Sequence, residues 1–203
     1  MKKGVVSIIE SKFLSLIDLI YQLVKSSFFF WITLVKNFVF FGLTASFCTT
    51  LKIIEEILLG NGTPTRILYK EISPEYKGYK GLSMVTSFLL IYFSAFIILP
   101  FPNSISSNTA SIIKFSMIYL FLLSLVLFTY ISWILVNMDL SVKQSIMFGF
   151  YLMIKRFLRT IILILFMIVL FSLSYKNFIF FIFLAPAIYA LGVRIVLKNI
   201  VVR

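Results

Sequence analysis

Long apolar runs separated by short polar stretches dominate the chain. Four runs have about the 20 residues that a membrane-crossing helix needs, at residues 27–47, 82–100, 112–136 and 178–197. A fifth run covers residues 157–175, where Arg159 can extend its charged end to the membrane surface. The pattern predicts an all-α, polytopic transmembrane helical bundle with about five spans, in a single integral membrane domain over residues 1–203.

Polar side chains interrupt the apolar pattern in the first 25 residues, and acids within it are atypical of a signal peptide. The polar residues recur at steps of three or four, on one stripe of a helix: Ser7, Ser11, Ser15, Asp18, Gln22 and Lys25. Each acid at the centre of a span would cost roughly 2.5 to 3.5 kcal/mol. We therefore expect residues 1–25 to form an amphipathic helix that lies on the membrane, and a sixth span is the alternative.

Composition excludes a soluble enzyme and a disordered chain. Of the 203 residues, 61% are hydrophobic and 13% are charged, whereas an average soluble domain is about half apolar and about a quarter charged. The 19 Lys and Arg against seven Asp and Glu give a formal net charge of +12. In a membrane protein we interpret this excess as anchoring to anionic lipid, with no nucleic-acid partner expected.

Basic residues predict the orientation in the membrane. They concentrate in residues 52–80, in residues 137–159 and in the tail from Arg194, which the positive-inside rule assigns to the cytoplasm. We therefore expect a multi-pass protein of the bacterial inner (cell) membrane with a cytoplasmic C-terminus. Five spans would place the N-terminus outside, against the lysines near it. Three explanations stay open: the first helix crosses, the first apolar run is re-entrant around Gly42, or the downstream charges dominate.

Local signals place short helices and one kink. Thr63-Pro64 and Ser73-Pro74 each predict an N-cap followed by proline in the first helical turn. The segment from Ser141 to Gln144 predicts a capping box at the start of a helix that continues toward Arg159. Pro186 predicts a kink in the last apolar run.

A series of landmarks along the chain carries a family resemblance. They are Phe30-Trp31, Asn37, residues 41–45, 51–52, 60–62, 76–80, 130–136 and 139–145, and Ala185-Pro186-Ala187. In their order they resemble the YesL-like family, bacterial integral membrane proteins classified as a domain of unknown function. The chain departs from the family pattern at Thr44 and over residues 134–136, where the family tends to carry proline.

The resemblance implies a role beside transport. Members of the family are typically encoded next to ATP-driven (ABC) sugar importers and have no established activity. We therefore expect a non-enzymatic accessory or regulatory component of a carbohydrate ABC transport system, with the lipid bilayer and ABC transporter subunits as partners. The alternative is a small transporter or substrate-capturing membrane subunit in its own right, because helix breaks and intramembrane polar residues build such sites.

Two groups of residues are candidate sites. Lys36 and Asn37 lie inside the first predicted span, where ionisable groups are costly, and Asp18, Glu55 or Glu56 could pair with Lys36. The simpler interpretation is that Lys36 lies near a span end. The second group is a cytoplasmic contact for a partner or for lipid headgroups: Lys143, Lys155, Arg156 and Arg159. Ordinary positive-inside anchoring is the simpler interpretation there.

Few residues in the sequence can carry chemistry. It has no histidine and one cysteine, Cys48, and we find no catalytic, nucleotide-binding or metal-binding motif. We therefore expect no catalytic residues, no cofactor and no metal, and we rank an intramembrane enzyme last. The tyrosines and lysines of residues 76–80 predict an aromatic belt at the membrane surface. We interpret Glu55 and Glu56 as a solvated face that pairs with Lys52.

Overall fold

The computed structural model describes the backbone of residues 2–60, 62–100 and 106–200, and the side chains of those residues except 2–13, 15, 107 and 199. Over these residues the chain is helical and contains no strand, so the predicted all-α bundle is confirmed. The helices are α1 (Lys2–Lys36), α2 (Leu43–Leu59), α3 (Thr65–Ile72), α4 (Lys80–Ile98), α5 (Ser107–Asn137), α6 (Val142–Lys155), α7 (Phe157–Lys176), α8 (Phe178–Phe183) and α9 (Ala185–Leu197). Two short 3₁₀ turns follow α1 and α9, at Val39–Phe41 and Lys198–Ile200.

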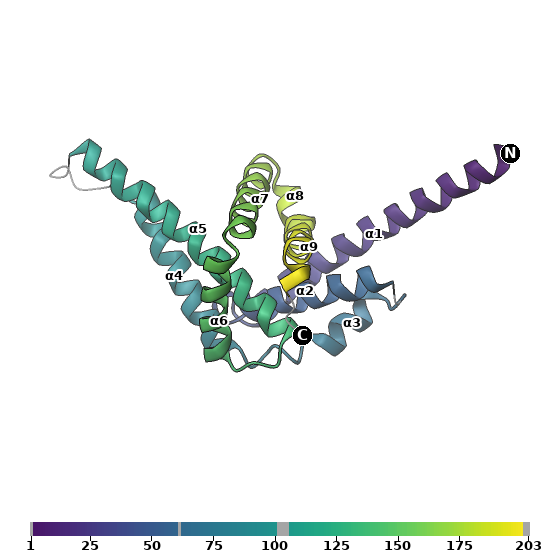
Figure 1. Cartoon of the computed structure of the whole chain (residues 1–203), viewed down its shortest axis with the longest axis horizontal. Helices are drawn as coiled ribbons and strands as arrows, with labels where there is room; N and C mark the ends of the chain where they lie inside the picture. The colour runs from purple at the N-terminus through teal and green to yellow at the C-terminus, as the bar shows by residue number, and fades with distance from the viewer. Residues whose placement is uncertain (1, 61, 101–105, 201–203) are drawn as a thin grey trace.

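The helices form a wide V (Figure 1). One arm is α1 and the other is the α4–α5 pair, and the arms meet where α2 and α3 lie. Helices α7, α8 and α9 stand between the arms, and α6 joins the vertex to α7. The start of α1 is at the tip of its arm, whereas α9 ends toward the vertex (Figure 1).

Four of the described helical segments are long and apolar enough to cross a membrane: Leu16–Lys36, Lys80–Ile98, Asn108–Asn137 and Phe157–Lys176. The apolar helix Ala185–Leu197 is shorter. Most of each segment in α1, α4 and α7 faces outward rather than into the bundle, and large hydrophobic side chains cover these outer faces. A lipid environment accounts for such faces, because soluble monomers rarely expose large contiguous apolar patches.

The first apolar run differs from the prediction. Residues 27–47 are not one helix: α1 is continuous from Lys2 to Lys36, and its apolar segment begins at Leu16. Neither Gly nor Pro interrupts residues 5–36, so the amphipathic start and the apolar segment join without a break. The helix ends where Phe38 and Val39 adopt positive φ angles of 52° and 38°. The chain then turns back, and α2 packs against α1.

Only part of the amphipathic stripe can be compared. The side chains of Ser7, Ser11 and Ser15 lie outside the described residues. Asp18 is exposed and accepts a hydrogen bond of 2.6 Å from Gln22 Nε2. Apolar residues on the same part of α1, such as Ile17 and Ile20, are exposed as well, so exposure does not distinguish a polar stripe there.

Helix α2 occupies the centre of the bundle. It packs against α1, α3, α4, α5 and α9, and its residues from Thr44 to Ile54 are buried except for Lys52. Four of them are Thr or Ser, and Thr50 Oγ1 donates a hydrogen bond of 2.8 Å to the Ser46 carbonyl. Ser46 Oγ likewise donates a bond of 3.0 Å to the Leu43 carbonyl. Such small side chains let neighbouring helices approach closely. Aromatic and aliphatic side chains from α5 and α9 complete this core.

One of the local signals behaves as the sequence predicts, one predicts only the approximate start of a helix, and one is wrong. Ser141 and Gln144 form the capping box at the start of α6, with each side chain bonded to the other residue's backbone N–H. Helix α3 begins after Pro64, although Thr63 does not cap it. The helix predicted after Ser73 is wrong: residues 73–79 form successive turns, such as the bond from Glu75 N to the Ile72 carbonyl. Pro74 gives α3 an end instead of starting a new helix.

Candidate functional site

The last apolar run breaks between α8 and α9. Helix α8 ends at Phe183, α9 begins at Ala185, and Leu184 between them has non-helical angles of φ −130° and ψ −38°. Pro186 lies in the first turn of α9 and has no backbone N–H to donate to the Ile182 carbonyl four residues earlier. The break predicted near Pro186 is therefore present, two residues before the proline.

Helix α1 satisfies the backbone groups that this break frees. Trp31 Nε1 donates a hydrogen bond of 2.9 Å to the Ile182 carbonyl, the acceptor that Pro186 leaves without a donor. On the other side of the break, the Ala187 N–H donates a bond of 3.2 Å to Ser27 Oγ, which is fully buried. Freed backbone groups in a membrane need such partners, because lipid offers none. The break is thus held within the protein, with α1 in the place where a bound ligand could lie.

The hydrogen bond from Trp31 can be tested by removing it and then restoring a donor for the same carbonyl. Trp31→Phe keeps an aromatic ring but leaves the Ile182 carbonyl without its donor, which we expect to cost about 1 to 3 kcal/mol. Adding Pro186→Ala returns an N–H four residues after Ile182. The double variant should therefore recover part of the thermal stability lost in Trp31→Phe, measured by unfolding in mild detergent. If the double variant were as unstable as Trp31→Phe or less stable, this role for Trp31 would be contradicted.

An ionic cluster joins α2 to α9. Arg194 Nη1 lies 3.0 Å from Glu55 Oε1, with only 12% and 20% of the two side chains exposed. Lys52 Nζ lies 3.1 Å from Glu55 Oε2 and 3.9 Å from Glu56 Oε1. The contact between Arg194 and Glu55 is an ion pair without hydrogen-bond alignment at Nη1. A charge this buried needs its partner, so the cluster fixes α9 against α2.

The sequence interpretation found only half of this cluster. Pairing of Lys52 with Glu55 and Glu56 is present as predicted, but the acids do not form a purely solvated face, because Arg194 covers Glu55. A signal was available: Arg194 lies inside the predicted span 178–197, where an ionisable residue needs a partner.

The structure places the candidate pair Lys36 and Asn37 at the end of α1, outside any polar site. Lys36 is exposed at the last residue of the helix, and its Nζ lies 5.9 Å from the centre of the Tyr69 ring. Asn37 Nδ2 donates a hydrogen bond of 2.8 Å to the Thr33 carbonyl. Glu55, one of the partners considered for Lys36, pairs with Lys52 and Arg194 instead. Lys36 is thus the last residue of its helix, where a cation interacts favourably with the helix dipole.

The four basic residues of the second candidate group are not gathered in one place. Lys143 is exposed in the first turn of α6, whereas Lys155 is its last residue, roughly 18 Å further along at 1.5 Å per residue. Lys155 Nζ lies 5.1 Å from the centre of the Tyr151 ring. Arg156 is exposed between α6 and α7, and Arg159 is half-buried in the first turn of α7. Lys155, Arg156 and Arg159 share the α6–α7 junction, and Lys143 stands apart.

The aromatic belt predicted over residues 76–80 is only partly at the surface. Tyr76 is buried and packs with Leu68 and Ile72 of α3, and its ring centre lies 6.2 Å from that of Tyr79. Burial raises the pKa of Tyr76 above that of a free tyrosine, so the phenol is neutral at physiological pH. Lys77 and Lys80 are exposed. Tyr76 therefore anchors the turns of residues 73–79 to α3.

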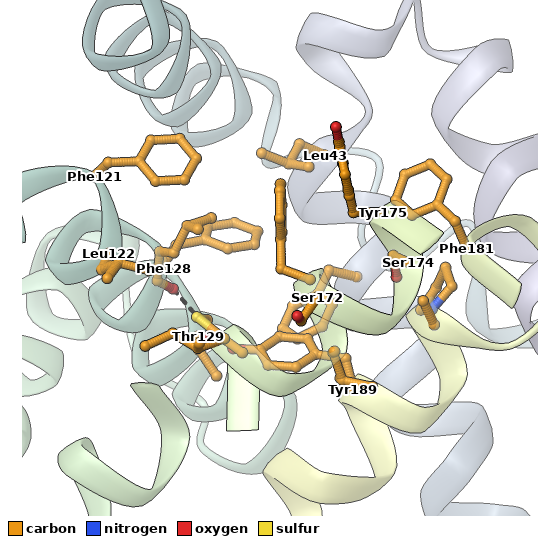
Figure 2. Close-up of a pocket in the computed structure, with 18 of the residues that line it drawn as sticks. Leu43, Phe121, Leu122, Phe128, Thr129, Ser172, Ser174, Tyr175, Phe181 and Tyr189 are labelled. Atoms are coloured by element: carbon orange, nitrogen blue, oxygen red, sulfur yellow. Dashed lines mark hydrogen bonds between the residues drawn. The ribbon is translucent and has the colours of Figure 1, made fainter. Parts of the chain in front are cut away.

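A large apolar cavity lies between the α5 arm and helices α7, α8 and α9. Its volume is about 840 Å³. Figure 2 shows Phe121, Leu122 and Phe128 of α5 on one side and the end of α7 on the other. Neither Lys36 nor Asn37 lines it. Two of its few polar atoms bond to each other, because Thr129 Oγ1 and Tyr189 Oη are 2.5 Å apart.

Within the described residues no three acids or cysteines come together as metal ligands. No protein-family model matches the chain, and no curated protein and no solved structure matches it either. The geometry of the chain itself therefore carries the functional argument.

Proposed function

We propose that this chain is a non-enzymatic integral membrane protein that acts by contact, as an accessory or regulatory component of a transport complex. The YesL-like resemblance implies a carbohydrate ABC importer as the partner. The observation that carries the proposal is the break before α9: the polar groups that a transporter would offer to a substrate are bonded to Trp31 and Ser27. Trp31 and Ala187, each part of a landmark of the resemblance, are the donors of these two bonds.

The proposed orientation puts the vertex of the V at the cytoplasmic face. The vertex includes α3 and the start of α6, which carry Lys70 and Lys143 on exposed positions (Figure 1). Because α1 is continuous and ends at Lys36 near the vertex, a single crossing puts its start on the other side of the membrane. The basic residues of α6 and of its junction with α7 are then available to acidic loops of a partner.

Co-purification tests the accessory role. A tagged chain would be expressed in its native host, extracted in mild detergent and analysed by mass spectrometry for importer subunits. We expect importer membrane subunits to co-purify, and Lys143→Glu/Arg156→Glu to reduce their recovery. The matched control is Lys176→Glu, which changes an exposed lysine at the other end of α7. Recovery of the wild-type chain without any importer subunit would contradict the proposal.

The alternative is a small transporter, which the broken helix α8–α9 favours because discontinuous helices build transporter sites. The apolar cavity argues against a sugar route, since a hydrophilic substrate would find few polar partners on its walls. The purified chain in proteoliposomes discriminates the two functions. We expect no uptake of labelled sugars by the chain alone, and saturable uptake would establish the transporter instead.

A further inference from the structure

The cavity between α5 and α7–α9 has an aromatic floor and hydrocarbon walls. The Phe47 ring lies at the floor, with its centre 5.5 Å from the Phe128 ring and 5.5 Å from the Tyr189 ring. Leu122 and Leu125 of α5 face it from one side and Ile168 of α7 from the other. The lining residues come from α1, α2, α4, α5, α7, α8 and α9, so parts of the chain far apart in sequence form a partly open space.

This space needs an occupant. Its volume of about 840 Å³ is the size of a small-molecule site, and because the space is partly open, molecules of the surrounding medium can fill it. Ordered water needs two to four polar partners. The polar atoms at the floor, Thr129 Oγ1 and Tyr189 Oη, bond to each other, and Trp31 Nε1 is bonded to the Ile182 carbonyl. The occupant is therefore hydrocarbon.

The cavity is continuous with the surface that faces lipid. Phe171 and Ile168 line it, yet 69% and 47% of their side chains are exposed on α7. Helix α7 is the most apolar of the helices that can cross a membrane, and most of it faces outward. A chain from the surrounding bilayer can therefore enter sideways, between α5 and α7, without leaving a hydrocarbon environment.

The two ends of the cavity differ in polarity. The floor is aromatic, whereas Ser172, Ser174 and Tyr175 lie in the last turns of α7, at its membrane-surface end. Figure 2 shows these three side chains along one side of the space. Tyr175 is 90% exposed, as expected for an aromatic residue at the interface. A lipid with its chain on the floor would present its polar headgroup to this rim.

We propose that the cavity holds one acyl chain of a bilayer lipid, with the methyl end toward Phe47 and Phe128 and the headgroup at the Ser172, Ser174 and Tyr175 rim. The site is independent of the accessory role, because it needs no partner protein. It would fix the spacing between the α4–α5 arm and α7, where protein atoms leave the space unfilled.

Native mass spectrometry tests the site directly. The protein purified in mild detergent without added lipid should retain one adduct with the mass of a phospholipid or another acyl lipid. Leu122→Trp fills the cavity and should lower the retained fraction roughly tenfold, which corresponds to about 1.4 kcal/mol of binding free energy. The matched control is Leu120→Trp, because Leu120 lies on the same helix, is exposed and does not line the cavity. Equal retention in both variants, no adduct on the wild type, or an adduct without acyl chains would overturn the proposal.

Tryptophan fluorescence gives a second test, which does not depend on filling the cavity with the Leu122→Trp side chain. The chain has two tryptophans: Trp31 lines the cavity and Trp133 is buried in the core. In a Trp133→Phe variant, one equivalent of a lipid brominated on its acyl chain, added in detergent, should quench Trp31. The same amount of lipid brominated only in its headgroup should not. Equal effects of the two lipids, or no quenching by either, would contradict an acyl chain in this space.

Discussion

Gly42→Ala is expected to lower the thermal stability of the purified protein by the equivalent of about 2 kcal/mol, the cost of overpacking a close contact. A Cβ at residue 42 would lie 2.7 Å from the Leu34 carbonyl oxygen and 3.0 Å from the Leu34 Cα. Both atoms belong to the backbone of α1, so the contact cannot be relieved by a side-chain rotation. The helices α1 and α2 would have to move apart, and unfolding in detergent would measure the loss.

The backbone conformation of Gly42 makes this prediction specific. Its φ of −96° and ψ of −14° are helical angles that alanine adopts freely, so the loss arises from the contact alone. Gly81→Ala is the matched control, because Gly81 lies in the first turn of α4 with no atom near the position of a new Cβ. We expect it to leave the stability unchanged or raise it by up to about 1 kcal/mol. A similar loss in both variants would contradict a close approach of α1 and α2 at Gly42.

Arg194→Met is expected to destabilise the protein by about 3 kcal/mol, near the lower end of the cost of breaking a buried ion pair. The Glu55 side chain would lose its nearest cation on α9, and 80% of that side chain is removed from solvent. Lys52 would still face Glu55 from its own helix, which keeps the cost from being larger. The free energy of unfolding, measured as a shift of the midpoint in detergent, reports this loss.

Two further variants show whether the effect comes from the pair. Lys52→Met changes the more exposed cation of the cluster, and we expect it to cost at most about 1 kcal/mol. In Glu55→Gln/Arg194→Met no unpaired charge remains, so the double variant should be more stable than Arg194→Met. If the stability lost in the double variant equalled the sum of the losses in Glu55→Gln alone and Arg194→Met alone, direct coupling of Arg194 and Glu55 would be excluded.

The helices could be predicted from the sequence because apolar runs of this length form helices wherever lipid is the solvent. Their boundaries depend on local chemistry, and the capping box at Ser141 identified one of them correctly. The end of α1 could not be predicted from local chemistry. It depends on positive φ angles at Phe38 and Val39, which are unusual for bulky residues and which packing of α2 against α1 holds in place.

The candidate site residues were predicted less well than the helices, because side-chain partners depend on tertiary packing. Lys36 was a candidate as a charge inside an apolar run, but the helix that contains it ends at Lys36 itself. Arg194 carried the same signal and is the residue with a buried partner. Its partner Glu55 is 139 residues away in the sequence, so no local spacing could identify it. The apolar cavity was likewise unpredictable, because it arises from the divergence of α5 and α7.

In the proposed orientation the vertex of the V lies at the cytoplasmic face and the tips of its long helices lie on the other side. Cysteine accessibility tests it most directly. Cys48 is fully buried, and Cys48→Ala provides a background for single cysteines at four exposed positions: Lys70 and Lys143 at the vertex, and Asn108 and Lys176 at the far ends of α5 and α7.

A thiol reagent that cannot cross membranes, applied to intact cells with permeable outer layers, should label Asn108→Cys and Lys176→Cys. It should label Lys70→Cys and Lys143→Cys only after the inner membrane is opened. The proposed orientation would be contradicted if all four cysteines were labelled in intact cells. It would also be contradicted if one vertex cysteine and one far-end cysteine were both protected.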